Sequence, residues 1–84
     1  MTHLCIRKAG AKYVVHPTTE AASRLSVETT EADVWLYTSE KDVAEFAQAN
    51  VFGSYDSQAS AESAIVMVDP GVDKIYKPPN MPNA

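Results

Sequence analysis

Residues 32–51, ADVWLYTSEKDVAEFAQANV, hold the strongest fold signal in this 84-residue chain. The part at 33–38, DVWLYT, places large apolar side chains in succession and leaves no polar face, which predicts a strand that is central or covered on both sides. Ser39 follows, with Asp42 three residues later, a spacing close to that of a capping box at a helix start. We therefore expect a strand, a capped turn and one helix to form the centre of the fold.

The helix predicted after this turn covers residues 40–50, where apolar side chains recur at helical spacing. Val43, Phe46 and Ala47 share one face of that helix and are expected to pack it on the sheet. Acidic residues in its first turn favour a helix start, because the helix dipole attracts anions there. Asn50 is suited to a left-handed C-cap.

The chain before this centre predicts a β-hairpin, with strands at 3–8 and 12–16. A two-residue turn at Ala9 and Gly10 gathers apolar side chains on one face, and a three-residue loop would turn the second strand over. The clean apolar face favours the two-residue turn. That face consists of Leu4, Ile6, Tyr13 and Val15.

The segment after the hairpin supports two local structures. Pro17 ends the second strand. Thr18 or Thr19 then caps a short helical turn over 20–24, and the rival is a strand over 24–28. Both are compatible in sequence, a turn of helix followed by a strand.

The last part of the chain contains a second near-continuous apolar run, AIVMVD at 64–69, which predicts a central or covered strand. The small polar run before it, 53–63, is expected to form a loop, or a hairpin connection that contains a poor helical turn. Pro70 and Gly71 predict a turn, and residues 72–77 predict a short edge strand.

Together these elements predict an α+β fold, a small antiparallel sheet of three to five strands with one main helix, about 40–50, packed on one face. The length suits one domain with a core that is only just sufficient. Residues 1–77 are expected to form that compact domain, and the proline-rich residues 78–84 a flexible tail.

Charge and cysteine content narrow the class of protein. The net charge is −4, which argues against direct nucleic-acid binding because that function needs a dominant basic face. The single cysteine, Cys5, permits no intramolecular disulfide and favours the cytosol. No apolar stretch approaches the roughly 18 residues of a membrane span. We expect a cytoplasmic protein, in the host cytoplasm if it is phage-encoded, without membrane association.

No residue pattern predicts catalysis. His3, Cys5 and His16 share one hairpin face in the favoured register, an arrangement that resembles three zinc ligands, but the chain has no CxxC or HxxxH spacing. The chain has neither the glycines of a phosphate-binding loop nor a GxSxG motif. We therefore expect no catalytic residue, no metal and no cofactor.

Partner contacts are expected among aromatic and acidic side chains, because Tyr and Trp anchor protein interfaces. Carboxylates on the same surface would pair with basic groups of a partner, or imitate a phosphate backbone, although imitation of DNA usually needs a denser charge. The candidate residues are Tyr37, Glu40, Asp42, Glu45, Tyr55 and Asp56.

The predicted function is that of a small acidic, non-enzymatic module that docks on a larger protein and inhibits or modulates it. In compactness, lone cysteine and bare strand-helix core, the chain resembles small phage-encoded inhibitors of host machinery such as anti-CRISPR proteins. This resemblance lies in size and style and carries over no residue roles. The alternative is a self-associating assembly subunit whose strand edges pair. A third class is an enzyme or metal protein centred on Cys5 and the two histidines.

Overall fold

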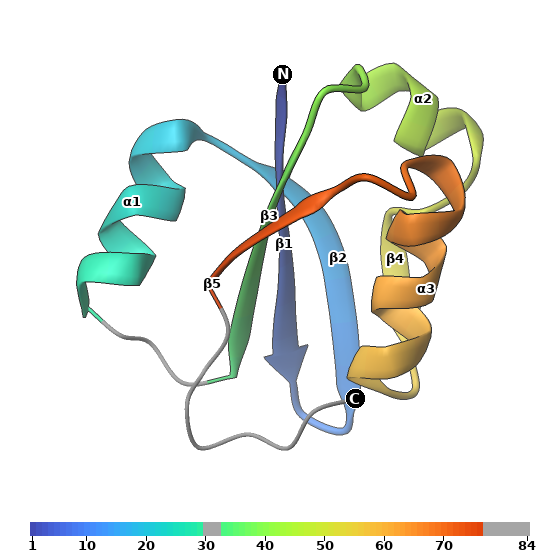
Figure 1. The fold of residues 1–84 in the computed structure, drawn as a ribbon. Helices are drawn as coiled ribbons and strands as arrows, with labels where there is room; N and C mark the ends of the chain where they lie inside the picture. The colour runs from blue at the N-terminus through green and yellow to red at the C-terminus, as the bar shows by residue number, and fades with distance from the viewer. Residues whose placement is uncertain (30–32, 77–84) are drawn as a thin grey trace.

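The computed structural model describes residues 1–29 and 33–76. This part of the chain forms a five-stranded antiparallel sheet with three helices (Figure 1). The elements in chain order are β1 (Thr2–Ala9), β2 (Lys12–Thr18), α1 (Glu20–Thr29), β3 (Val34–Ser39), α2 (Val43–Gln48), β4 (Gly53–Tyr55), α3 (Gln58–Val68) and β5 (Asp73–Tyr76). The predicted α+β class and antiparallel sheet are confirmed, but three helices take the place of one main helix.

The strand order is β4-β2-β1-β3-β5, so the first strand of the chain is the middle strand of the sheet. The β1-β2 turn lies at Gly10 and Ala11, one residue later than predicted, and Ala9 lies opposite Lys12. Gly10 adopts a φ of 64°, a conformation that glycine reaches without steric cost. Moving the turn by one residue shifts each partner by two positions, so the predicted apolar face is preserved.

One face of the sheet packs against α2 and α3, and we call it the major face (Figure 1). Trp35 and Tyr37 point to this face from β3, and Phe46 reaches it from α2. The Trp35 ring meets the Tyr13 ring edge-on, with centroids 5.8 Å apart. The buried cluster of the major face consists of Leu4, Ile6, Val15, Trp35, Tyr37, Phe46, Val51, Ala61 and Ile65.

The opposite face, which we call the minor face, lies under α1 (Figure 1). Its buried cluster consists of Cys5, Val34 and Leu36. Alternate residues of β3 therefore enter different clusters, and residues 34–37 are all buried. The prediction that this strand is central or covered on both sides is confirmed.

Helix α1 runs without a break from Glu20 to Thr29, and the rival strand at 24–28 is wrong. Thr19 supplies the predicted cap, because its Oγ1 accepts a hydrogen bond from the N–H of Ala22 at 3.1 Å. The Thr19 side chain satisfies one of the first N–H groups of the helix, which have no partner within the helix itself, and so stabilises a helix start at this position.

Helix α2 is shorter than the predicted helix at 40–50. It begins after Asp42, whose N–H donates to Glu45 Oε2 at 3.3 Å. Ser39 is not its cap. The Ser39 hydroxyl donates to Asp69 Oδ2 at 2.6 Å and accepts the N–H of Lys41 at 3.0 Å. The serine therefore ties the end of β3 to the end of α3.

Phe46 is the buried residue of α2, whereas Val43 and Ala47 are exposed, so the predicted packing through those two residues is wrong. The predicted C-cap at Asn50 is confirmed by its φ of 58°. The N–H of Val51 donates to Phe46 O at 3.0 Å, as in a Schellman motif. A helix this short turns only one large side chain into the core.

Helix α3 is the largest departure from the prediction, because it includes residues 64–68 of the run 64–69 that was expected to be a strand, and Asp69 is its C-cap residue. Ser57 caps it by accepting the N–H of Ser60 at 3.1 Å. Ile65 enters the core, while Val66 and Met67 face solvent. The polar run before the helix forms β4 and the first turns of α3 in place of a loop.

The predicted turn at Pro70 and Gly71 and the predicted edge strand after it are confirmed. The N–H of Val72 donates to Asp69 O at 3.1 Å across the turn, and β5 pairs with β3. The predicted tail at 78–84 lies outside the described residues. No helix within the described ranges is long and apolar enough to span a membrane.

Candidate functional site

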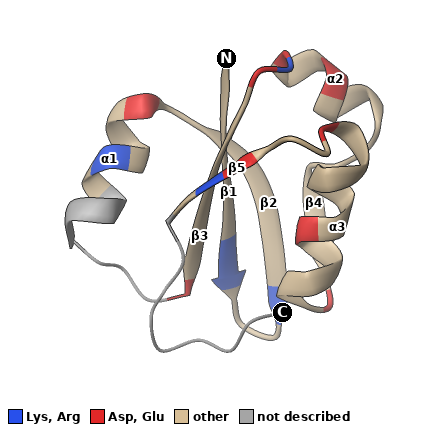
Figure 2. Ribbon diagram, in the orientation of Figure 1, with Lys and Arg blue, Asp and Glu red and all other residues tan. Residues whose placement is uncertain are grey.

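The structure separates the six residues predicted to bind a partner into three places. Glu40, Asp42 and Glu45 are exposed around the start of α2, where Figure 2 shows a group of acidic positions. Tyr55 and Asp56 lie at the far end of the sheet, beside the β1-β2 turn. Tyr37 lies in the core of the protein.

Tyr37 is fully buried and belongs to a polar network between β3, α3 and β5. Its hydroxyl donates to Glu62 Oε1 at 2.7 Å and accepts a hydrogen bond from Gln58 Nε2 at 3.0 Å. Burial raises the pKa of Tyr37, and the neighbouring Glu62 raises it further. This burial removes Tyr37 from any surface that a partner would contact.

Glu62 is the charged centre of the same network, and its side chain is 19% exposed. Lys74 Nζ of β5 lies 2.9 Å from Glu62 Oε1. Burial acts to raise the pKa of Glu62, but the hydrogen bonds from Lys74 and Tyr37 together outweigh it and lower the pKa. The network therefore fastens α3 and β5 to β3.

Tyr55 and Asp56 are engaged within the chain. Tyr55 is half-buried against the major face, and its hydroxyl donates to Val51 O at 2.6 Å. Asp56 is exposed and forms an ion pair with Lys12, whose hydrogen bond and charge lower the pKa of the carboxyl group. The polar groups of Tyr55 and Asp56 are therefore already paired with other residues of the same chain.

An open hollow of about 540 Å³, which we call the terminal hollow, lies beside the acidic end of α2. Its lining includes Met1, His3, Pro17, Asp42 and Val43. Val43 is 46% exposed here. The terminal hollow thus combines exposed apolar side chains with a carboxylate from the predicted acidic set.

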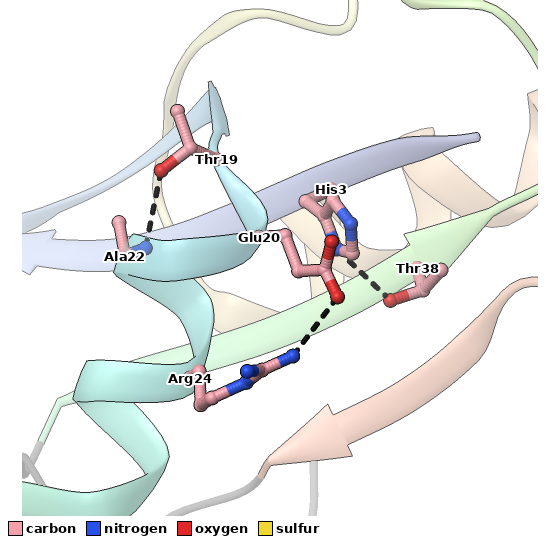
Figure 3. A network of polar contacts seen from close by, with 6 residues as sticks. All are labelled: His3, Thr19, Glu20, Ala22, Arg24 and Thr38. Atoms are coloured by element: carbon pink, nitrogen blue, oxygen red, sulfur yellow. Dashed lines mark hydrogen bonds and ion pairs between the residues drawn. The ribbon is translucent and has the colours of Figure 1, made fainter.

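A second space, the α1 cavity, has a volume of about 250 Å³ and lies between α1, β1 and β5. Its lining residues are His3, Glu20, Ser23, Arg24 and Ile75. Arg24 Nη2 donates to Glu20 Oε1 at 3.0 Å, and His3 Nδ1 lies 3.3 Å from Thr38 Oγ1 (Figure 3). His3 lines both the terminal hollow and the α1 cavity.

Ser23 is the unusual member of the α1 cavity. Its side chain is buried, with 3% of the residue exposed, and its hydroxyl has no hydrogen-bond partner. The sequence analysis missed this site. The signal was the spacing of Glu20, Ser23 and Arg24, because positions i, i+3 and i+4 share a face only if the segment is helical.

The histidines and the cysteine considered as zinc ligands do share the minor face. Cys5 lies directly opposite His16. His3 precedes Cys5 by two residues on β1, so both side chains lie on the same face of the sheet. Cys5 is buried, and His16 Nδ1 lies 3.0 Å from Pro17 O. Across residues 1–29 and 33–76, no group of three or more His, Cys, Asp or Glu side chains is placed to hold a metal ion.

Comparisons with known proteins add no family to this description. No protein-family model, no curated protein and no solved structure matches the chain. The candidate functional sites are therefore the terminal hollow and the α1 cavity, together with the charged residues around them.

Proposed function

We propose that the protein is a non-enzymatic binding module that docks on a larger protein through its α2 end and inhibits or modulates that partner. The observation that carries the proposal is the terminal hollow, where Met1 and Val43 expose apolar surface beside Asp42. The occupant that suits it is a partner segment with apolar and basic side chains.

The apolar part of this surface supplies affinity. Met1 and Val43 both remain largely accessible in the isolated chain. Burying apolar surface is favourable by about 25 cal/mol per Å². A partner side chain seated in the terminal hollow would cover both residues at once.

The acidic part supplies selection of the partner. Glu40, Asp42 and Glu45 stand around the start of α2, with Lys41 as the one cation among them. Because the chain carries a net charge of −4, its field attracts basic surfaces and repels acidic ones. Carboxylates at the rim of an interface act mainly on the association rate.

The sheet edges favour docking over self-association. The strands at the two edges, β4 and β5, contain three and four residues. Edges this short offer few backbone groups for pairing with another copy. Self-association through an added strand therefore has less support than binding at the terminal hollow.

The test starts with capture of the partner from native host lysate, followed by affinity measurement with the purified partner. Val43→Glu and Asp42→Lys should each weaken binding roughly tenfold or more, as expected for contacts in a buried interface. Met67→Glu is the matched control, because Met67 is 85% exposed on α3, away from the terminal hollow.

Equal binding by Val43→Glu and the wild type would contradict the proposal. So would loss of binding in Met67→Glu alone, because that result would move the interface to α3. A solution mass of two chains that falls to one on shortening β5 would support the assembly subunit instead.

A further inference from the structure

We infer that the α1 cavity binds a small zwitterion, a molecule of free amino-acid size that carries one carboxylate and one ammonium group. The residues that would hold it are Glu20, Ser23 and Arg24 of α1, with His3 and Ile75 as the facing walls. Figure 3 shows Glu20, Arg24 and His3 of this set. This site shares His3 with the terminal hollow but contains none of the acidic residues at α2.

The volume sets the size of the ligand. The α1 cavity measures about 250 Å³. A water molecule occupies roughly 30 Å³ of liquid, so the space holds on the order of eight water-sized groups. Drug-sized ligands fill pockets of roughly 300–1,000 Å³. The α1 cavity therefore suits a molecule with the atom count of a small amino acid.

The charges set the chemical class. The wall carries one carboxylate, Glu20, and one guanidinium, Arg24, which form an exposed pair at 3.0 Å. A ligand with a single charge would match one of these groups and repel the other. A zwitterion gives each group a partner, with its carboxylate on the guanidinium fork and its ammonium on Glu20.

The existing pair does not prevent this exchange. The side chains of Glu20 and Arg24 are 69% and 68% exposed, and exposed ion pairs of this kind contribute little to stability. Glu20 engages only one nitrogen of a group that has five N–H donors. Both side chains can therefore turn to a ligand without loss of the fold.

Ser23 provides an independent observation. A buried hydroxyl without a partner is costly and rare in folded proteins. A serine within a helix usually relieves this cost by bonding to the carbonyl four residues earlier. Here Thr19 O accepts the backbone N–H of Ser23 at 2.9 Å, and the Ser23 hydroxyl has no partner. A charged ligand group in the cavity would supply one.

The apolar wall limits the ligand side chain. Ile75 faces the α1 residues from β5 and is the large aliphatic residue of the lining. It offers surface to a short aliphatic group. Glycine, alanine and valine are therefore suitable probes.

The experiment is a titration of the ¹⁵N-labelled protein with these three amino acids, followed by NMR. Saturable shifts are expected at Ser23, Arg24, His3 and Ile75. The N-acetyl and carboxamide derivatives, which each lack one charge, should bind roughly ten- to a hundredfold more weakly. Absence of saturable shifts, equal binding of the derivatives, or shifts confined to α2 would each overturn the inference.

Variants separate a ligand role from a structural role. Arg24→Met and Glu20→Gln should weaken binding by a similar factor, and Lys12→Met, a cation at the other end of the sheet, should leave it unchanged. Ser23→Ala should weaken binding while it raises the unfolding midpoint of the ligand-free protein. Wild-type binding by Arg24→Met would overturn the site, because that exposed substitution does not threaten folding.

Discussion

The two faces of the sheet differ in how completely they are covered. Among the residues that the structure describes, the major face meets two helices and encloses nine buried residues, whereas the minor face meets α1 and encloses three. The same strand, β3, serves both, with Trp35 and Tyr37 on one side and Val34 and Leu36 on the other. Most of the described buried core therefore lies on the major face, and the α1 cavity lies beside the smaller cluster of the minor face.

The described side chains of the helices differ in the same way. Helix α3 turns Ala61 and Ile65 to the sheet, where both are fully buried. Among the described side chains of α1, the buried one is Ser23. Because a serine buries little apolar surface and brings a hydroxyl that needs a partner, Ser23 contributes less to the packing of its face than Ile65 does.

The largest expected effect contrasts one core residue from each face. Phe46→Ala should lower the free energy of unfolding by about 3–5 kcal/mol, because it empties the centre of the major face. Leu36→Ala should cost about 2–3 kcal/mol, since a less enclosed site relaxes more easily. Urea unfolding measures both variants. Equal losses would show that the faces contribute alike.

The polar network of the major face predicts a smaller loss. Tyr37→Phe keeps the ring but removes the hydroxyl that bonds to Glu62 and Gln58, so stability should fall by about 1–2 kcal/mol. Tyr55→Phe is the matched control, and its half-buried hydroxyl should be worth at most about 1 kcal/mol. A Tyr55 loss as large as the Tyr37 loss would argue that burial of the network adds nothing.

The pH dependence of stability tests the charge in that network. The pKa of Glu62 lies below its usual 4.5 in the folded state. Above this value the carboxylate is ionised in both states and stabilises the fold. As the pH falls, the unfolded chain binds the proton first, so the contribution is lost as the pH passes through the folded pKa.

Glu62→Gln should therefore show a shallower fall in unfolding midpoint below about pH 4.5 than the wild type does. Asp56, whose pKa is also lowered, accounts for part of the remaining slope. An unchanged acid profile in Glu62→Gln would mean that Lys74 and Tyr37 do not favour the ionised form in solution.

The smallest effect has the opposite sign and concerns the minor face. Ser23→Ala should raise stability by about 1 kcal/mol, because it removes an unpartnered buried hydroxyl and improves helix propensity. Ser63→Ala, at an exposed position of α3, should gain only the propensity part, about 0.5 kcal/mol. Thermal unfolding measures both, and a loss of stability in Ser23→Ala would indicate that the hydroxyl is satisfied by water.

The sequence predicted the strand at 33–38, which the structure has at 34–39, and the apolar face of the hairpin, because both depend on local apolar order. It failed at 64–69, since a continuous apolar run suits a covered strand as well as a buried helix. The cap at Ser57 and the alanine-rich residues after it were the signals for α3. They were assigned to a loop because most side chains of the run 53–63 are small or polar.

The candidate site was less accessible to prediction than the fold. The burial of Tyr37 depends on Gln58 and Glu62, which lie 21 and 25 residues away. The α1 cavity joins side chains from β1, α1 and β5, and no short pattern reports such a junction. The exposure of Glu40, Asp42 and Glu45 agrees with the sequence because charged residues at a helix start avoid burial.

The place of β1 between β2 and β3 makes the two ends of the chain unequal to trimming. Deleting residues 2–9 would remove the strand between β2 and β3. Both of these strands would then lose the backbone hydrogen bonds that they form with β1. Deleting residues 73–76 would uncover only one side of β3. Truncated versions of this protein should therefore tolerate shortening from the C-terminal end far better than from the N-terminal end.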